Sequence, residues 1–273
     1  MSEVLAVIGA GGMGEAIARR LGSGRQVLLA DVDAALLDRV AATLDGDGYQ
    51  VRTRTVDVSQ RDSVASLAEH AAGLGSVTAL AHTAGLSPAQ ASTAAILAVD
   101  LVGVALVLEE FGKVVAPGGA GVVIASMAGT FSAGQLPAEV EAAFATTPAE
   151  ELLDLPFLAG PGMSQPGIAY SVAKRGNQVR VQAASLAWGR RGARVNSISP
   201  GVISTVMGRQ ELAGESGAGM RAMVEASGTG RLGTAGDIAA AAAFLLGPDA
   251  SFITGIDLLV DGGVVAATRH GGS

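Results

Sequence analysis

The stretch Val4-Leu5-Ala6-Val7-Ile8-Gly9-Ala10-Gly11-Gly12-Met13-Gly14 decides the fold that we predict for this chain. Its apolar run has the length and β-branched content of a buried strand, and a helical pattern follows over 12–21. The glycines between them have the Gly-x-Gly-x-x-Gly spacing of a dinucleotide-binding turn, in which backbone N–H groups approach a pyrophosphate. In a chain with 39 glycines this turn is weak evidence by itself. The predicted pyrophosphate-binding residues are Gly9, Gly11, Gly12, Met13 and Gly14.

Outward from this turn, short apolar runs alternate with longer segments of helical period. We predict strands over 4–8, 26–30, 50–55, 77–82, 121–126, 194–198 and 256–260. We predict helices over 12–21, 34–44, 61–73, 93–115, 169–188 and 236–246. Such alternation is typical of a parallel sheet covered on both faces. The predicted fold is therefore α/β, a single-domain Rossmann-type doubly wound parallel sheet of about seven strands over 1–273, with a small helical insertion.

Two stretches interrupt the alternation. Residues 131–165 contain no Lys or Arg, and four prolines divide them into short pieces, so we expect one or two small surface helices there. Residues 206–229 mix Gly, Ser and Met and are expected to be mobile. We interpret insertion 131–165 and substrate loop 206–229 as lids over a binding site.

Composition excludes several classes of protein. The chain has 273 residues, no cysteine and a formal charge of −7, so it has no disulfide framework and no zinc-cysteine site. The acidic balance argues against nucleic acid and against an anionic membrane surface as partners. The longest apolar run is too short to span a membrane, and the N-terminus resembles no signal peptide, so we expect a cytoplasmic protein. The three histidines show no ligand spacing, so no metal site is predicted.

Acidic residues follow the second and third predicted strands. Asp31 lies 22 residues after Gly9, near the offset of about 20 expected for a carboxylate that binds a ribose 2′-hydroxyl. A 2′-phosphate would be repelled there, and the neighbouring Val32 offers no positive charge, so NAD is favoured over NADP. The alternative for Asp31 or Asp33 is a helix N-cap. Asp57, after the third strand, is predicted either to bind the adenine edge or to cap the next helix.

Tyr170 and Lys174 form the strongest candidate for catalysis. Residues four apart on a helix share one face, and a nearby ammonium favours the phenolate and lowers the pKa of a tyrosine. Such a pair can exchange a proton with the oxygen of an alcohol or ketone. Ser126, at the end of the fifth predicted strand, is placed to hydrogen-bond the same oxygen. After the fourth strand, the small Ala84 and Gly85 let the backbone pass close to a cofactor.

Taken together, these residues resemble the short-chain dehydrogenase/reductase family over nearly the whole chain outside 131–165. Tyr170-x-x-x-Lys174 matches its catalytic motif, and Ser126 matches its substrate-orienting serine. The resemblance implies that Lys174 also holds the nicotinamide ribose and that 199–205 grips the nicotinamide carboxamide. It further implies cofactor contacts at Asp57, Val58, Thr83, Ala84, Gly85, Pro200, Gly201, Ile203 and Thr205.

The chain departs from the family pattern at three places. The glycine turn is one residue shorter than the common form, and His82-Thr83 replaces an Asn-Asn pair that links strands. Asp100 stands where the family carries the Asn of its catalytic tetrad. The negative charge of Asp100 is expected to stabilise the ammonium of Lys174 while opposing a tyrosinate. Our hypothesis is that Asp100 preserves the proton relay and moves the pH optimum.

The insertion gives a looser resemblance to a bacterial subgroup that includes 3α-hydroxysteroid dehydrogenase/carbonyl reductase. Ser126 and Tyr170 are 44 positions apart, more than in common members. This resemblance suggests a bulky apolar, steroid-like substrate, with a pocket to which these aromatic and Met side chains contribute: Phe131, Phe144, Phe157, Met163, Met207, Met220 and Met223. For most of them, packing of the insertion is the better interpretation.

The function predicted from the sequence is that of an NAD-dependent oxidoreductase that interconverts a secondary alcohol and a ketone. The alternative is a non-catalytic NAD(H)-sensing binding protein of the same fold. The expected partners are a small-molecule alcohol or ketone and further copies of the chain in a homodimer or homotetramer, as the family resemblance implies.

Overall fold

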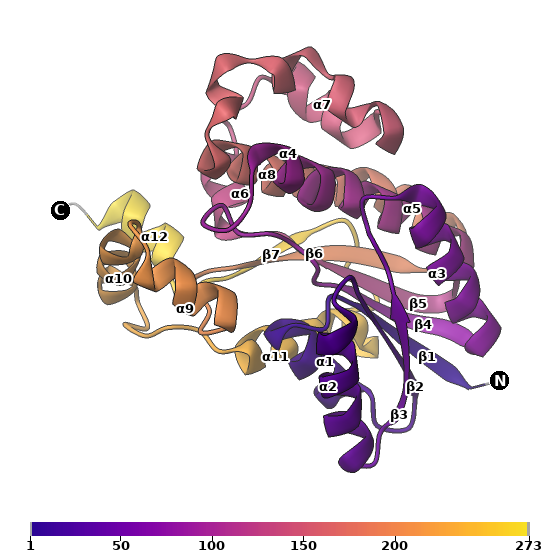
Figure 1. Ribbon diagram of the computed structural model, residues 1–273. Coiled ribbons are helices and arrows are strands. Elements are labelled where there is room, and N and C mark those ends of the chain that lie inside the picture. The colour runs from indigo at the N-terminus through magenta and orange to yellow at the C-terminus, as the bar shows by residue number, and fades with distance from the viewer. Residues whose placement is uncertain (1, 272–273) are drawn as a thin grey trace.

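Seven extended segments form one parallel sheet in the computed structural model, which describes residues 2–271 (Figure 1). The strands are β1 (Glu3–Ile8), β2 (Gln26–Asp31), β3 (Gln50–Thr55), β4 (Ser76–His82), β5 (Val115–Ile124), β6 (Arg194–Pro200) and β7 (Asp257–Val260). Their order in the sheet is β3-β2-β1-β4-β5-β6-β7. This arrangement confirms the predicted α/β fold with a doubly wound parallel sheet of seven strands.

Helices cover both faces of the sheet because the strands are apolar on both sides. One face carries α1 (Gly12–Leu21), α2 (Ala34–Gly46) and α11 (Ala235–Leu246), and the other carries α3 (Arg61–Leu74), α5 (Val104–Val114) and α8 (Pro166–Arg190) (Figure 1). Each layer encloses its own cluster of buried aliphatic side chains. With so few aromatic residues, aliphatic packing supplies most of the hydrophobic stabilisation.

The strand order reverses beside β1, which pairs with β2 on one side and with β4 on the other. In doubly wound sheets, ligands bind at this reversal, outside the carboxyl ends of the strands. The carboxyl ends of β1 and β4 are level, since Ile8 pairs with both Ala30 and His82. The glycine turn and the segment after β4 therefore meet at one edge of the sheet.

Two predicted elements differ from the structure. The strand expected over Gly121–Ser126 is β5, which begins at Val115 and ends at Ile124. Pro117-Gly118-Gly119 looks like a turn in the sequence, but it forms an irregularity inside the strand, where the register against β4 shifts. The helix expected over 93–115 is divided into α4 (Thr93–Ile96), a π-helical segment η1 (Leu97–Gly103) and α5. Single π-helical turns of this kind often mark functional sites, and this one contains Asp100.

The insertion forms α6 (Met127–Ser132), α7 (Ala138–Thr146) and the 3₁₀ segments η2 (Ala149–Asp154), η3 (Pro156–Ala159) and η4 (Pro161–Ser164). It packs against α8 rather than projecting from it (Figure 1). The Phe144 side chain is fully buried and meets Phe157 edge to face, with ring centroids 6.3 Å apart. Glu141 accepts two hydrogen bonds from the Arg175 guanidinium, at 2.7 and 2.9 Å.

The second interruption is also helical, although we expected a mobile loop. It contains α9 (Val206–Ala213) and α10 (Gly217–Ala226). Farther along the chain, the 3₁₀ segment η5 (Pro248–Ala250) precedes β7, and α12 (Val264–His270) follows it. The Thr205 hydroxyl caps α9 by accepting from the backbone N–H of Gly208 at 3.1 Å. Within residues 2–271, no helix has the length and apolarity that a membrane crossing requires.

Candidate active site

The glycine turn lies between the end of β1 and the start of α1, at the centre of the sheet edge. Gly9 has a φ of +96°, which only glycine adopts without strain. A Cβ atom on Gly9 would lie 2.4 Å from the backbone nitrogen of Ala84, and one on Gly14 would lie 1.9 Å from the carbonyl oxygen of Gly9. At Gly11, by contrast, a Cβ atom would meet nothing within 4 Å. The turn is thus packed on its inner side and has space at Gly11, while the Met13 side chain packs against the core.

Asp31 ends β2 and is held against this turn. Its Oδ2 accepts from the backbone N–H of Ala10 at 2.8 Å, and its Oδ1 accepts from that of Asp33 at 3.1 Å. The helix cap is Asp33, whose carboxylate bonds the first N–H groups of α2. The side chain of the next residue, Val32, is 68% exposed and apolar. Asp33, and not Asp31, is therefore the N-cap of α2, and the alternative role of Asp31 as a helix cap is wrong.

Asp57 lies beyond β3 and is exposed. Its Oδ1 accepts from the backbone N–H and the hydroxyl of Ser59, at 2.9 and 2.7 Å. Gln60 occupies the N-cap position of α3, so the alternative in which Asp57 caps that helix is wrong. A contact of Asp57 and the buried Val58 with adenine stays a prediction.

Thr83 joins the segment after β4 to the glycine turn. Its hydroxyl donates to the carbonyl oxygen of Gly9 at 2.7 Å, and its backbone N–H donates to that of Ile8 at 2.7 Å. Thr83 therefore keeps a hydrogen-bonded link across the sheet edge although His82-Thr83 replaces Asn-Asn. Gly85 is also tightly constrained, because a Cβ atom there would lie 2.6 Å from Oδ1 of Asp100 and 3.2 Å from Nζ of Lys174.

Lys174 is buried on α8 at the centre of the candidate catalytic group. Its Nζ donates to the carbonyl oxygen of Ile124 at 3.3 Å and to Oδ1 of Asp100 at 3.4 Å. The ammonium also lies 5.4 Å from the centroid of the Tyr170 ring. Asp100 is fully buried, and its two oxygens accept from the backbone N–H of Leu86 at 3.0 and 3.2 Å. The structure thus brings together Tyr170, Lys174 and Asp100, which the sequence places up to 74 residues apart.

Burial and charge act in opposite directions on these groups. Burial raises the pKa of Tyr170, the Lys174 ammonium opposes this, and the charge of Asp100 adds to it. Burial alone would lower the pKa of Lys174, but Asp100 and then Tyr170 raise it above its usual value. Burial raises the pKa of Asp100 against the opposing charge of Lys174. Lys174 has the predicted effect on Tyr170, but the expected net lowering of the tyrosine pKa is wrong in this structure because desolvation of the phenol is larger.

Ser126 lies just beyond β5 and not at its end as predicted. It is the N-cap of α6, where its hydroxyl accepts from the backbone N–H of Ala128 at 3.2 Å. Ser126 also lies near enough to Tyr170 to lower the pKa of the phenol. The serine and the tyrosine therefore share one side of the site, as the predicted roles require.

The segment after β6 approaches the glycine turn from the other side. The backbone N–H of Gly201, next to Pro200, donates to the carbonyl oxygen of Val260 at 3.0 Å, which fixes the segment to β7. Ile203 is buried and forms an isolated bridge with Gly233. A Cβ atom on Gly12 would lie 3.3 Å from the Thr205 methyl group. The predicted pyrophosphate-binding turn and the predicted nicotinamide-binding segment thus lie side by side at Gly12 and Thr205.

Two polar residues near this group were missed from the sequence. The Ser87 hydroxyl, fully buried, donates to Oε1 of Glu211 on α9 at 2.6 Å. The Glu211 charge also raises the pKa of Tyr170. No local pattern identifies this pair because 124 residues separate its members.

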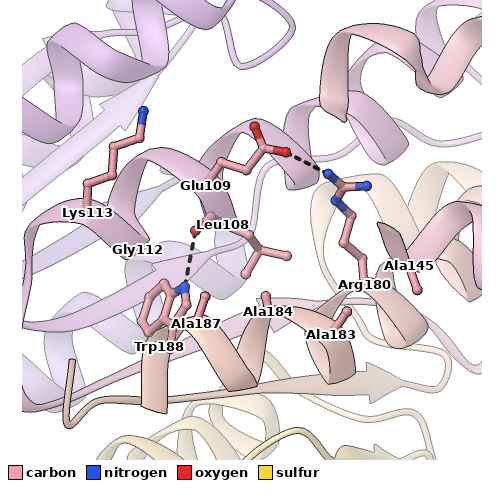
Figure 2. Close-up of a pocket in the computed structure, with 10 residues that line it drawn as sticks. All are labelled: Leu108, Glu109, Gly112, Lys113, Ala145, Arg180, Ala183, Ala184, Ala187 and Trp188. Carbon is pink, nitrogen blue, oxygen red and sulfur yellow. Dashed lines mark hydrogen bonds and ion pairs between the residues drawn. The ribbon is translucent and has the colours of Figure 1, made fainter. Parts of the chain in front are cut away.

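A separate pocket of about 430 Å³ lies on the outer side of α5 and α8 (Figure 2). Figure 2 shows Trp188 donating to the carbonyl oxygen of Leu108, and Arg180 paired with Glu109. The Trp188 side chain is buried and has a packing role. None of the ten residues around this pocket is a predicted site residue. Elsewhere in residues 2–271, no cluster of three or more His, Cys, Asp or Glu side chains is arranged to hold a metal ion.

This geometry defines a class of protein that binds a nicotinamide dinucleotide and carries out oxidation or reduction. Residues 3–138 match the family model described as short chain dehydrogenase, and residues 148–265 match the one described as enoyl-(acyl carrier protein) reductase. The chain belongs to the short-chain dehydrogenase/reductase family.

Its relatives agree with this assignment. The chain is 45% identical over 262 residues to the short-chain dehydrogenase/reductase bsc3 of Alternaria brassicicola, covering 96% of this chain and 95% of that protein. It is 30% identical to the galactitol 2-dehydrogenase (L-tagatose-forming) of Cereibacter sphaeroides, covering 94% and 93%. Among solved structures, it superposes on an actinorhodin polyketide ketoreductase with NADPH, with a TM-score of 0.74, 25% identity and coverage of 96% and 97%. The protein is therefore an oxidoreductase that uses a nicotinamide cofactor.

Proposed function

We propose that this protein is an NAD-dependent oxidoreductase that interconverts a secondary alcohol and a ketone. The observation that carries the proposal is the arrangement of Tyr170 beside Ser126 and Lys174, with the Lys174 ammonium 5.4 Å from the phenol ring. A bound nicotinamide supplies the hydride acceptor for oxidation and the hydride donor for reduction. The relative named for galactitol oxidation supports an alcohol as the substrate.

In the oxidation direction, Tyr170 removes the proton from the substrate hydroxyl. Ser126 donates a hydrogen bond to the same oxygen and fixes its position. The positive charge of Lys174 favours the deprotonated tyrosine, and Asp100 holds that ammonium in place through a 3.4 Å contact. In the reverse direction Tyr170 returns the proton to the developing alkoxide. Positioning and proton transfer together account for the contribution of these side chains to the rate.

Selection of NAD rests on Asp31. Because its carboxylate is fixed to Ala10 of the glycine turn, it accepts a hydrogen bond from an adenosine ribose hydroxyl and repels a 2′-phosphate. Val32 provides no compensating positive charge. The related ketoreductase, whose structure contains NADPH, shares 25% identity with this chain, and we expect Asp31 to give this chain the other preference.

The proposal is tested by measuring the oxidation of a panel of secondary alcohols with NAD, in wild type and in Tyr170→Phe. We expect kcat to fall about 100-fold to 10,000-fold when the acid/base hydroxyl is removed, with NADH binding retained. Tyr49→Phe is the matched control, because within residues 2–271 the Tyr49 hydroxyl donates only to the Arg19 carbonyl oxygen, at 2.7 Å. NADH binding without turnover of any alcohol would favour the NAD(H)-sensing protein instead.

A cytoplasmic location and a homodimer or homotetramer are part of the proposal. So are the lid roles of 131–165 and 206–229 and the bulky apolar substrate. Phe144 is too deeply buried to contact such a substrate, so the residues that remain for that pocket are the more exposed ones.

A further inference from the structure

Two side-chain hydrogen bonds connect α9 to the segment after β4. Glu211 accepts from the Ser87 hydroxyl at 2.6 Å, and Gln210 accepts from the side-chain amide of Gln90. The Ser87 oxygen also accepts from the backbone N–H of Ala89 at 3.2 Å. Ser87 is fully buried, so its hydroxyl orients Glu211 with little freedom.

This connection lies next to the catalytic group. Leu86, which precedes Ser87, donates its backbone N–H to Asp100. On the other side, Glu211 lies six positions after Thr205, whose methyl group faces Gly12 in the dinucleotide turn. The Glu211 carboxylate is therefore bonded to the residue that follows Leu86, the donor to Asp100, and it lies on the helix that Thr205 caps. Its effect on the pKa of Tyr170 agrees with that placement.

The Glu211 carboxylate still has hydrogen-bonding capacity in this position. Ser87 occupies Oε1, and within residues 2–271 no side chain or backbone group donates to Oε2. A carboxylate has about four acceptor positions on its two oxygens. An apolar substrate group placed against it would remove water without replacing the lost hydrogen bonds, which is unfavourable. A hydroxyl group would donate to the free oxygen and keep it satisfied.

We infer that Glu211, positioned by Ser87, selects substrates that carry a second hydroxyl group beside the alcohol that is oxidised. The inference rests on the proposed oxidation of a secondary alcohol, and it replaces the bulky apolar substrate by a diol or polyol. No bond is made or broken by Glu211 itself: it accepts a hydrogen bond while Tyr170 takes the proton of the reacting hydroxyl. Sites that hydrogen-bond a substrate hydroxyl discriminate strongly against analogues that lack it, because the polar group of the site is then left unpaired.

The test compares butane-2,3-diol with butan-2-ol, which have the same carbon chain and differ by the second hydroxyl. We expect wild type to prefer the diol in kcat/KM by about tenfold or more, since one hydrogen bond to a charged group contributes about that factor. Glu211→Leu removes the acceptor and should abolish this preference while turnover of butan-2-ol continues. Glu211→Gln keeps one acceptor oxygen and should retain part of it. Gln210→Ala is the matched control, because it breaks the other connection between the same two segments and should leave the preference unchanged.

Three results would overturn the inference. Equal kcat/KM for the two alcohols in wild type would show that the second hydroxyl group of the substrate is not recognised. A parallel loss of both activities in Glu211→Leu and Gln210→Ala would show that the connection only closes the site. A stronger preference for 3-aminobutan-2-ol than for the diol would mean that Glu211 selects an ammonium group of the substrate and not a second hydroxyl group.

The proposed function can fail separately from this inference. If wild type oxidises neither these two alcohols nor any member of the panel, the proposed function is wrong, and calorimetric titration of the diol into the NADH-loaded protein still tests Glu211. Heat of binding in wild type that is absent in Glu211→Leu supports the inference, and equal titrations in the two proteins contradict it.

Discussion

The Lys174 ammonium lies 3.4 Å from the Asp100 carboxylate, and both groups are buried. Asp100 belongs to the π-helical segment η1 and is held from the other side by the Leu86 N–H. The pair places a negative charge within reach of the catalytic phenol, where an Asn would place none. Asp100 accordingly raises both the pKa of Lys174 and the pKa of Tyr170. Asp100 therefore stabilises the ammonium of Lys174 and opposes ionisation of Tyr170.

Replacing Asp100 by Asn should shift the pH dependence of alcohol oxidation. Oxidation requires the deprotonated phenol, so activity rises with pH through the pKa of Tyr170. Asp100 raises that pKa, and its removal should move the rising limb of kcat/KM to lower pH. The profile from about pH 5 to 10 measures the shift for Asp100→Asn against wild type. Superimposable profiles would show that the charge of Asp100 has no influence on the acid/base step.

Replacing Asp31 by Asn should weaken the preference for NAD over NADP. The Asn side-chain oxygen can still accept from the Ala10 N–H, so the turn keeps its shape while the negative charge is lost. We expect the ratio of kcat/KM for NAD and NADP to fall about tenfold or more, because a charge repulsion of about 1.4 kcal/mol corresponds to that factor. Steady-state kinetics with both cofactors measure the ratio. An unchanged ratio would assign the selection to other residues.

Acid should destabilise the protein through His82. Burial, and then the charge of Lys174, lowers the pKa of His82 from its usual 6.5 to about 3. The folded state therefore binds fewer protons than the unfolded state below pH 6.5, and stability is lost as the pH falls from there toward 3. The expected loss between pH 7 and pH 5 is about 2 kcal/mol. Neither ring nitrogen has a hydrogen-bond partner in the described part of the chain, so protonation gains no compensating contact there.

Urea unfolding at about pH 7 and about pH 5 measures this effect. The loss on acidification should be smaller in His82→Asn than in wild type by that amount, since the variant has no titrating ring. Comparing the two pH values within each protein removes the intrinsic effect of the substitution. An equal loss in both proteins would mean that His82 does not contribute to acid sensitivity.

Truncating Phe144 should test whether the insertion is part of the core. The ring is fully buried among residues that pack on α8, and Phe→Ala changes at such positions lower the free energy of unfolding by about 3 to 5 kcal/mol. Phe252→Ala is the control, because that side chain is fully exposed and its loss should change stability by less than about 0.5 kcal/mol. Thermal or urea unfolding compares the two variants. Equal stability of the two would show that the insertion folds independently of the sheet.

The fold class could be predicted from the sequence because the patterns that indicate it are local. Apolar runs of strand length, helical periods and the turn at Gly9 each depend on residues close together in the chain, and a parallel sheet follows from the alternation of strands with helices. The order of the seven strands within the sheet comes from the tertiary structure. Predictions were wrong where tertiary contacts override local preference. Pro117-Gly118-Gly119 forms part of β5 because β4 pairs with the segments on both sides of it, and the helix expected over 93–115 adopts a π-helical segment around Asp100.

The candidate site divides in the same way. The Gly9–Gly14 turn, Asp31 and the Tyr170 and Lys174 pair were predicted because each has a characteristic spacing, and the structure places them at one edge of the sheet. Burial decided the direction in which the tyrosine pKa moves, and only the folded chain determines burial. Glu211 accepts a hydrogen bond from Ser87, a residue 124 positions away in the sequence. Hydrogen bonds and desolvation depend on distances in space, so the tertiary structure alone fixed the charge balance and the polar side of this site.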